Sequence, residues 1–255
     1  MNVGKAHQRI IREEKSQTDF GGLFGYPTSP DIKKAELQEV NYETAKKIIE
    51  EYEWLGTMGT TQFHYGIFYD GVLGGVVCFG YFQAMNTNSG GHPYAPYVTK
   101  EFANKGIQLT RGACAWWVHE HSGSKLIGYG LREMQSKGYK YAIAFSDSEA
   151  GEIGTLYQAT NWYYLGSTND VHYDLYFADN RLYMNDRDFY KKYKFRGKQK
   201  LLEFISDKPH LRARARLPKG RYIKLLGTKK ENKIMLEQLE DKIVPYPKRT
   251  GLHGA

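Results

Sequence analysis

The most informative stretch of this 255-residue chain is Gly154-Thr155-Leu156-Tyr157-Gln158-Ala159-Thr160-Asn161-Trp162-Tyr163-Tyr164-Leu165-Gly166. Its pattern predicts a short helix over about 150–158, followed by a strand through 163–165. Just upstream, the apolar run 141–145 predicts a buried strand. A strand, a helix and a second strand in this order are typical of an α/β sheet.

Two polar side chains within this stretch are candidates for chemistry. Tyr157 could act as a general acid, because a phenol can deliver a proton to a leaving group. Asn161 could hydrogen-bond the edge of a nucleic-acid base, or it could fix a loop. Core packing is the alternative explanation for the aromatic residues here, and it is favoured for Trp162.

A group of carboxylates follows the predicted strand 141–145, in the run Ala144-Phe145-Ser146-Asp147-Ser148-Glu149. In open α/β sheets, ligands bind in the crevice beyond the carboxyl ends of the strands. Asp147 could therefore act as a general base toward an amine. Capping of the next helix is an equally good explanation of its position.

A second candidate site lies at a predicted helix start, in Glu120-His121-Ser122-Gly123-Ser124-Lys125. Small residues at a helix N-terminus let backbone N–H groups approach an anion, and the helix dipole favours negative charge there. The run could hold a phosphate through Gly123, Ser124 and Lys125. Ser and Gly also cap helices for purely structural reasons, so this alternative stays open.

The remaining pattern adds strands and helices on both sides of this region. Asn41 is a suitable N-cap, and Asp70-Gly71 is a strong hairpin turn. Residues 108–120 are ambiguous between strand and helix, and 83–97 form a long loop rich in Asn, Gly and Pro. The other predicted elements are a strand over 34–40, a helix over 43–52, hairpin strands over 63–69 and 72–79, a helix over 125–135, a strand over 221–226 and a helix over 232–241.

This order of elements predicts an α/β fold in which a mixed sheet is flanked by helices. The sheet and its helices are expected to form one domain over residues 34–185. Residues 1–33 are polar, with Gly21-Gly22 and two prolines, and are expected to form an N-terminal arm. Residues 186–255 are expected to form a basic C-terminal extension.

The net charge of +8 is unevenly distributed along the chain. From residue 208 to the end there are 13 basic and 4 acidic residues, whereas the first 207 residues carry 23 basic and 24 acidic residues. A local positive field attracts polyanions, nucleic acid above all, by neutralising phosphates and releasing counterions. The chain also holds 21 Tyr, 12 Phe and 4 Trp, which suit base stacking as well as core packing. A solvated tail without a partner is the alternative.

Other features argue against several classes of protein. No apolar run approaches the roughly 20 residues that a membrane span needs, and the N-terminus lacks the apolar core of a secretory signal. Cys78 and Cys114 are too few for a disulfide framework, so we expect reduced, buried thiols and a cytoplasmic location. His119 and His121 lack an evident third ligand, so we predict no metal site. Residues 54–59 could form a substrate loop or a packed turn.

Taken together, these motifs resemble the GNAT (Gcn5-related N-acetyltransferase) superfamily. In that superfamily the acyl-CoA site comprises a strand, a pyrophosphate-binding loop, a helix, a second strand and a short helix that carries a tyrosine. Residues 122–124 are similar to the pyrophosphate loop, and 141–145 to the following strand. Tyr157 precedes Asn161-Trp162 as the family tyrosine precedes its Gly-Phe step. The resemblance covers roughly residues 34–166.

The chain is more similar to the Mom-like branch of that superfamily, phage proteins that modify adenines in DNA. This resemblance extends to about residue 248. It implies conversion of the adenine exocyclic N6 amine to a carbamoylmethyl (acetamido) derivative, which protects phage DNA from restriction in the cytoplasm of a bacterial host. The residues that carry it are Arg111, Ser124, Asp147, the run 154–162, and the basic ending 220–226 with 246–248.

The resemblance implies a role for each candidate residue. An adenine flipped out of double-stranded DNA would meet Asp147, which would orient or deprotonate N6, and Asn161 would complete the catalytic group. Tyr157 would protonate the leaving group or orient the donor. A small-molecule donor, of which an acyl-CoA-like molecule is the candidate, would bind through Gly123, Ser124 and Lys125. The expected DNA contacts are Arg111, Arg212, Arg214, Arg216, Arg221, Lys224, Lys229 and Lys230.

Two other functions remain open at this point. The same fold could serve an N-acyltransferase that acts on a small amine, a protein or a hypermodified pyrimidine. Alternatively, the chain could be a nucleic-acid-binding protein without catalysis.

Overall fold

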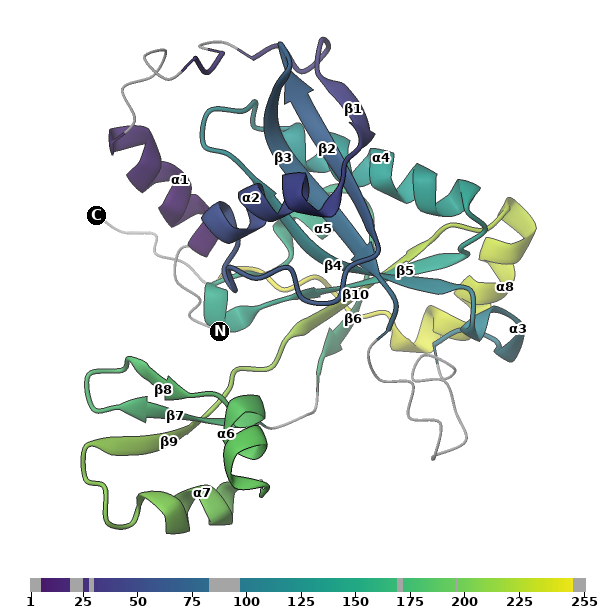
Figure 1. The fold of residues 1–255 in the computed structure, drawn as a ribbon. Helices are drawn as coiled ribbons and strands as arrows, with labels where there is room; N and C mark the ends of the chain where they lie inside the picture. The colour runs from purple at the N-terminus through teal and green to yellow at the C-terminus, as the bar shows by residue number, and fades with distance from the viewer. Residues whose placement is uncertain are drawn as a thin grey trace.

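The computed structural model describes residues 6–18, 25–27, 30–82, 97–168, 172–195 and 197–249. Most of them form a large mixed sheet in the order β1-β2-β3-β4-β5-β10-β6, shown in Figure 1. Its strands are β1 (Glu36–Glu39), β2 (Phe63–Tyr69), β3 (Val72–Gly80), β4 (Gly106–Cys114), β5 (Tyr141–Ser146), β10 (Gly220–Leu225) and β6 (Tyr163–Ser167). The α/β class with a mixed sheet flanked by helices is thereby confirmed.

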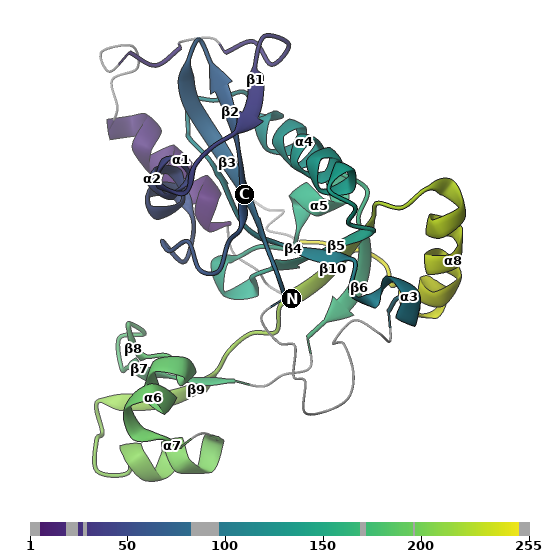
Figure 2. The ribbon, with the colours of Figure 1, turned by 45° about the vertical axis from the view of Figure 1, so that its right-hand side comes forward.

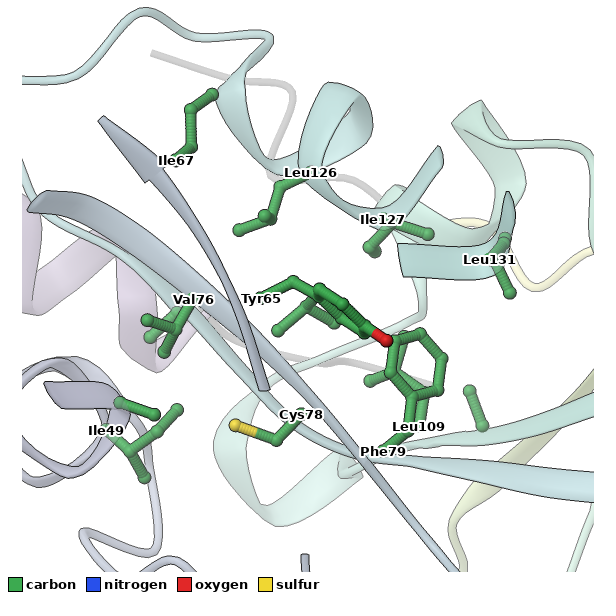
Figure 3. Packing of buried hydrophobic residues seen from close by; sticks show 14 of the residues in the cluster. Ile49, Tyr65, Ile67, Val76, Cys78, Phe79, Leu109, Leu126, Ile127 and Leu131 are labelled. Carbon is green, nitrogen blue, oxygen red and sulfur yellow. The ribbon is translucent and has the colours of Figure 1, made fainter. Parts of the chain in front are cut away.

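Helices cover both faces of the β2–β3–β4 part of the sheet. They are α1 (His7–Thr18) and α2 (Tyr42–Tyr52) on one face and α4 (Ser122–Ser136) on the other, as Figure 2 shows. The alternation of β3 explains this arrangement, since successive side chains of a strand point to opposite faces. Val76 and Cys78 face Ile49 of α2, whereas Phe79 and Tyr65 face α4 (Figure 3).

The large sheet opens between its two central strands. β4 and β5 are parallel and pair only from Gly106 opposite Tyr141 to Gln108 opposite Ile143. Beyond that point β4 continues beside β3 as far as Cys114, and β5 continues beside β10 as far as Ser146. A register shift opposite Cys78 and Phe79 marks the same part of β4. The two strands therefore diverge toward their carboxyl ends.

A second, three-stranded sheet has the order β8-β7-β9. We call residues 172–217, which contain this sheet and two helices, the small module. In Figures 1 and 2 the small module lies apart from the large sheet. Its elements are β7 (Tyr173–Phe177), β8 (Leu182–Met184), α6 (Asp186–Tyr193), α7 (Lys198–Ile205) and β9 (Leu211–Ala215). Leu175, Phe189 and Leu201 form a hydrophobic cluster of its own.

The last part of the chain returns to the large sheet. β10 inserts between β5 and β6, antiparallel to both. It is followed by α8 (Lys229–Leu239) and a 3-10 turn (Glu240–Lys242), and Met235 and Leu239 of α8 are fully buried. Residue 186, where the sequence placed a boundary, lies inside the small module, in which β7 pairs with β8 on one side and with β9 on the other. β10 belongs to the large sheet.

Most predicted elements appear close to their expected positions. The hairpin is β2 and β3, and the ambiguous run 108–120 is a strand as far as Cys114. The predicted helix over 150–158 is two pieces, a 3-10 turn (Ser148–Ala150) and α5 (Thr155–Ala159). Within the predicted arm, residues 7–18 form α1. Of the predicted loop 83–97, all but residue 97 lies outside the described residues.

None of the helices in the described part of the chain is both long enough and apolar enough to cross a membrane.

Candidate active site

A pocket of about 350 Å³ lies where β4 and β5 diverge. Its walls include residues 108–114 of β4, Phe145 and Asp147 at the end of β5, and residues 152–157 before and in α5. Gly123 of α4 and Arg12 of α1 also line it. Four of the predicted catalytic, donor-binding and DNA-contacting residues line this pocket: Arg111, Gly123, Asp147 and Tyr157. His119 and residues 54 and 55 of the predicted substrate loop line it as well.

Both carboxylate oxygens of Asp147 have partners within the protein. Oδ2 forms an ion pair with Lys219 Nζ at 2.6 Å. Oδ1 accepts a hydrogen bond from the backbone N–H of Glu149 at 3.0 Å, which caps the 3-10 turn that follows β5. Asp147 therefore combines the two roles that the sequence left open, because it lines the pocket and also caps the next turn.

Glu152 is a second carboxylate in the pocket, and sequence reasoning did not single it out. Its Oε2 accepts a hydrogen bond from Asp147 N–H at 3.3 Å. Burial is the main cause that raises the pKa of Glu152 to about 7, and the neighbouring charges of Asp147 and Glu53 act in the same direction. A carboxyl group with this pKa can both accept and release a proton near neutral pH.

Glu53, which follows α2, brings a third carboxylate to the pocket. Its Oε2 accepts a hydrogen bond from Leu55 N–H at 2.7 Å and lies 3.9 Å from Arg111 Nε. Burial raises its pKa, while Arg111 opposes that shift. Arg111 in turn donates to the carbonyls of Thr57 and Thr110, at 2.6 and 2.7 Å. The Arg111–Glu53 pair thus forms part of the pocket wall.

Tyr157 lies on α5 against the rings of Trp162 and Tyr222, at centroid distances of 5.3 and 5.2 Å. Burial strongly raises the pKa of its phenol, and the nearby carboxylates of Glu152 and Glu53 add to the shift. The hydroxyl group therefore keeps its proton and can act only as a hydrogen-bond donor, an acceptor or a proton source.

The predicted phosphate-binding residues do not act together. Gly123 lines the pocket, but a Cβ at this position would lie 3.2 Å from Leu156, so the start of α4 and α5 are closely packed here. The Ser124 hydroxyl donates to the carbonyl of His121 at 2.9 Å. Lys125 Nζ donates to the carbonyls of Ile32 and Ala35. The side chains of Ser124 and Lys125 are therefore bound to the protein's own backbone, and of the three residues only Gly123 lines the pocket.

Asn161 does not line the pocket. Its backbone has φ +58° at the turn between α5 and β6, and its carbonyl accepts a hydrogen bond from Lys224 Nζ at 3.0 Å. Lys224 also donates to the carbonyl of Thr160 at 2.9 Å, and burial lowers its pKa. Asn161 therefore helps to fix a loop, which is one of the two roles that the sequence left open. Lys224 is half-buried, and its ammonium group is bound to the two carbonyls of that loop.

The other predicted DNA contacts fall at two ends of the large sheet. Arg212, Arg214 and Arg216 alternate along β9 and the residue after it, while Arg221 on β10 lies over the ring of Tyr97 and donates to its hydroxyl. Arg214 pairs with Glu149 at 2.7 Å, and Arg216 pairs with the buried Asp174. These residues lie toward the carboxyl end of β5, near the pocket. Lys229 and Lys230 lie on α8, which packs at the opposite end of β5 through Lys140 and Glu231.

Sequence reasoning missed Lys219, Glu152 and Glu53, and it also missed the contribution of α1. Gln8 of α1 donates to the carbonyl of Gly112 on β4 at 2.7 Å, and Arg12 donates to the carbonyls of Trp116 and Val118. A signal for Glu152 did exist, since Gly151 and Gly154 flank it in a run of carboxylates. Nothing in the sequence pattern joins residues 8 and 12 to the pocket.

The histidines and cysteines form no evident metal site. Among the described residues, no group of three His, Cys, Asp or Glu side chains is placed to hold a metal ion. The rings of His119 and His121 contact each other at a centroid distance of 5.2 Å. Cys78 and Cys114 are free thiols, and burial raises their pKa to about 12 and about 11, respectively. Neither thiol is therefore an activated nucleophile.

A mixed sheet flanked by helices is the GNAT-like architecture that the motifs predicted. Within that class, the sequence profile of the Mom protein family matches residues 34–248, and the chain belongs to this family.

Known proteins similar to the chain include a phage protein and several acetyltransferases. The chain is 27% identical over 182 residues to the methylcarbamoylase mom of Escherichia phage Mu, which covers 68% of this chain and 69% of that protein. An N-acetyltransferase from Staphylococcus aureus Mu50 aligns over 76% of this chain and 99% of its own, with 13% identity and a TM-score of 0.42. The GNAT family N-acetyltransferase YhbS from Escherichia coli, solved in complex with CoA, aligns over 54% and 72%, with 14% identity and a TM-score of 0.36.

Proposed function

We propose that the chain is a transferase that modifies DNA, and that it replaces one hydrogen of the adenine N6 amine with a carbamoylmethyl group. Membership of the Mom protein family and the similarity to a protein named methylcarbamoylase support this proposal. The observation that carries it is the single pocket in which a phenol and two carboxyl groups, those of Tyr157, Asp147 and Glu152, face the same space.

The size of the pocket limits how adenine could reach these groups. A volume of about 350 Å³ is near the lower end of the range for ligand pockets and suits one base and the reactive end of a small donor. A base that remains stacked in a duplex cannot enter it, so the target adenine would be flipped out of the helix. The lone pair of N6 is delocalised into the ring, so loss of a proton from N6 would aid attack on the donor.

The residues of the pocket suit distinct parts of this reaction. Asp147, held by Lys219, would accept a hydrogen bond from the amine and orient it. Tyr157, whose phenol stays protonated, would donate to the leaving group of the donor. The donor itself is a small molecule that carries the carbamoylmethyl group.

DNA would be held by positive side chains near the mouth of the pocket. Arg212 is exposed on β9, and Arg214 lies over the ring of Tyr176 at 4.1 Å and bridges to Glu149, two residues from Asp147. Contacts of arginine with phosphates set the register of a duplex without reading its sequence. The pocket and the arginines of β9 would therefore contact the same DNA duplex.

Mass spectrometry of nucleosides from the DNA of cells that express the protein tests this proposal. We expect a modified deoxyadenosine whose added group is carbamoylmethyl. An acetyl group, which an acetyltransferase would add, differs from it by the mass of one NH group. Unmodified deoxyadenosine in these cells, beside a modified control from cells expressing an active Mom protein, would reject the proposed function.

A further inference from the structure

Glu152 occupies a tight turn that fixes its carboxyl group in the pocket. The turn lies between the 3-10 turn and α5, and the glycines at 151 and 154 have φ of +69° and +70°. Two hydrogen bonds join Glu152 to Asp147 reciprocally, since Glu152 N–H donates to the Asp147 carbonyl at 3.0 Å and Asp147 N–H donates to Glu152 Oε2 at 3.3 Å. The backbone therefore orients this side chain.

Few groups around Glu152 can neutralise its charge. The nearest charged and titratable groups include other carboxylates that raise its proton affinity, a phenol, and cations that are already paired or bound to carbonyls. Lys219 is paired with Asp147, and Arg249 donates to the carbonyl of Gly151 at 3.0 Å. The charged and titratable groups that line the pocket around Glu152 are Asp147, Glu53, Glu120, His119, Tyr157, Lys219, Arg249, Arg111 and Arg12.

Glu120, Asp147, Glu53 and Glu152 line the pocket, and the last three, which are not exposed, differ in what they can do. Asp147 has Lys219 on one oxygen and a backbone N–H on the other. Glu53 faces Arg111 and accepts hydrogen bonds from its own loop. Glu152 lacks a direct ion pair among the described residues, and its contact with the Asp147 backbone involves one oxygen. A carboxylate that is stabilised by a cation is a weaker base than one that is not.

We propose that Glu152, and not Asp147, is the general base that accepts the proton from adenine N6. This inference rests on the proposed function. In the step, the N6–H bond breaks and a new O–H bond forms on Glu152. The electron pair left on N6 forms the N–C bond to the methylene carbon of a small-molecule carbamoylmethyl donor. That carbon's bond to its leaving group breaks, and the leaving group departs with the electron pair and accepts a proton from Tyr157, while the carboxylic acid formed on Glu152 returns a proton to the phenol oxygen.

The titration of Glu152 agrees with this assignment. Its pKa of about 7 places the change between the basic and the acidic form near neutral pH, where a general base is most effective. The rate of the transfer step should therefore rise with pH through about 7 and then level off. Protonation of Glu152 at lower pH would remove the base.

The test compares single-turnover modification of a defined DNA duplex, with the donor supplied by a cell extract free of the protein, by the wild type and by Glu152→Gln. The glutamine keeps an oxygen for the hydrogen bond from Asp147 N–H but cannot accept a proton. We expect a loss of at least about 100-fold in rate, in the range of general-base catalysis, with DNA affinity unchanged. Asp147→Asn should lower the rate without removing its rise near pH 7.

Two more variants separate catalysis from folding. Glu237→Gln is the control, because Glu237 is an exposed carboxylate on α8, at the opposite end of β5 from the pocket. It should retain the wild-type rate. Glu152→Ala, which opens space for a small carboxylate, should regain part of its activity when formate is added. A structural defect would not respond to formate.

The outcomes separate this inference from the proposed function. If the wild type produces carbamoylmethyladenine and Glu152→Gln is as fast as the wild type, the assignment of Glu152 is overturned while the proposed function stands. The same follows if the rise near pH 7 disappears in Asp147→Asn and persists in Glu152→Gln. If the wild type modifies no adenine, the proposed function fails and the inference fails with it.

Discussion

Asp147 and Glu152 are five residues apart and have very different surroundings. The position of Asp147 after a buried strand can be inferred from the sequence, because ligand sites gather at the carboxyl ends of strands. The raised pKa of Glu152 cannot be inferred in this way, since it reflects burial in the folded chain, and since Glu53 from the N-terminal half raises it and Lys219 beside β10 lowers it. Sequence reasoning therefore found the loop but only one of its two carboxylates.

The stability of the protein should depend on pH through Glu152. Because folding raises the pKa of Glu152, the folded state holds its proton more tightly, and the stabilisation from that proton is lost as pH rises from about 4.5 toward 7. Glu152→Gln removes this pH-dependent loss of unfolding free energy, which amounts to at most about 3 kcal/mol. We expect Glu152→Gln to melt at a higher temperature than the wild type at pH 8, and the difference to shrink at pH 5. Thermal melts at both pH values, with Glu237→Gln as the control, measure this effect.

Removal of the Tyr157 hydroxyl should impair chemistry more than folding. The ring packs against Trp162 and Tyr222, and phenylalanine preserves these contacts. We expect Tyr157→Phe to reduce the modification rate by about 100-fold, in the range of general-acid catalysis, with a change in unfolding free energy below about 1 kcal/mol. Nucleoside mass spectrometry and a urea melt provide the two measurements. An unchanged rate would remove Tyr157 from the proposed mechanism.

Lys125 is predicted to stabilise the fold without binding the donor. Its ammonium group joins α4 to the carbonyls of Ile32 and Ala35 just before β1. We expect Lys125→Met to cost about 1–3 kcal/mol of unfolding free energy, because hydrogen bonds from a charged donor are lost. The KM for the donor should remain that of the wild type. Lys47→Met, at an exposed position of α2, is the control, and a selective rise in KM for Lys125→Met would restore Lys125 to the donor site.

The prediction of one continuous helix over 150–158 was wrong. Two glycines divide this segment into two pieces. Gly151 and Gly154 adopt positive φ, which ends the 3-10 turn and starts α5 separately. Carboxylates and apolar residues at helical spacing predict a helix, but they do not show which glycine leaves the helical region. The break matters for the site, since it turns Glu152 into the pocket.

The positive φ and the close packing at Gly154 yield a direct prediction. A Cβ there would lie 2.4 Å from the ring of Tyr222. We expect Gly154→Ala to cost about 3 kcal/mol or more, because strain and overpacking add. Gly138→Ala is the matched control, because Gly138 has φ +93° but no atom within 4 Å of the added Cβ, so it should cost about 1 kcal/mol. Equal losses in a denaturant melt would show that packing at Tyr222 contributes nothing.

The divergence of β4 and β5 could not be read from sequence. The apolar run 141–145 was expected to form a buried strand, whereas residues 108–120 were ambiguous between strand and helix. Pairing between strands depends on long-range register, and here it stops after Gln108 and Ile143. The pocket exists because the two strands stop pairing at this point, so the sequence predicted only some of the residues that line it.

At the scale of the whole molecule, the positive charge divides between two ends of the large sheet. The count of 13 basic and 4 acidic residues from position 208 onward treated this charge as one segment. Arg212 and Arg214 lie on β9 of the small module, which Arg214 joins to Glu149 just after β5, whereas Lys229 and Lys230 lie on α8 at the far end of β5. The small module and α8 are well separated in Figure 2. A duplex whose base enters the pocket would lie at the first of these ends.

This division predicts which cations contact DNA. We expect Arg212→Ala to weaken binding of a duplex several-fold and to reduce the slope of log affinity against log salt by about one. Lys230→Ala removes an equally exposed positive charge from α8 and should leave both quantities nearly unchanged. Binding isotherms at several salt concentrations measure the slopes. A loss with Lys230→Ala and none with Arg212→Ala would place the duplex at the other end of the sheet.

The insertion of β10 between β5 and β6 constrains the order in which the chain can fold during synthesis on the ribosome. β6 has no neighbour in its sheet until residues 220–225 have been synthesised, after the whole of the small module. The small module closes its own cluster from nearby residues, whereas the large sheet must wait for a contact between distant ones. A nascent chain that stalls before position 220 would thus expose one edge of β5 and both edges of β6, which makes late truncations prone to aggregation.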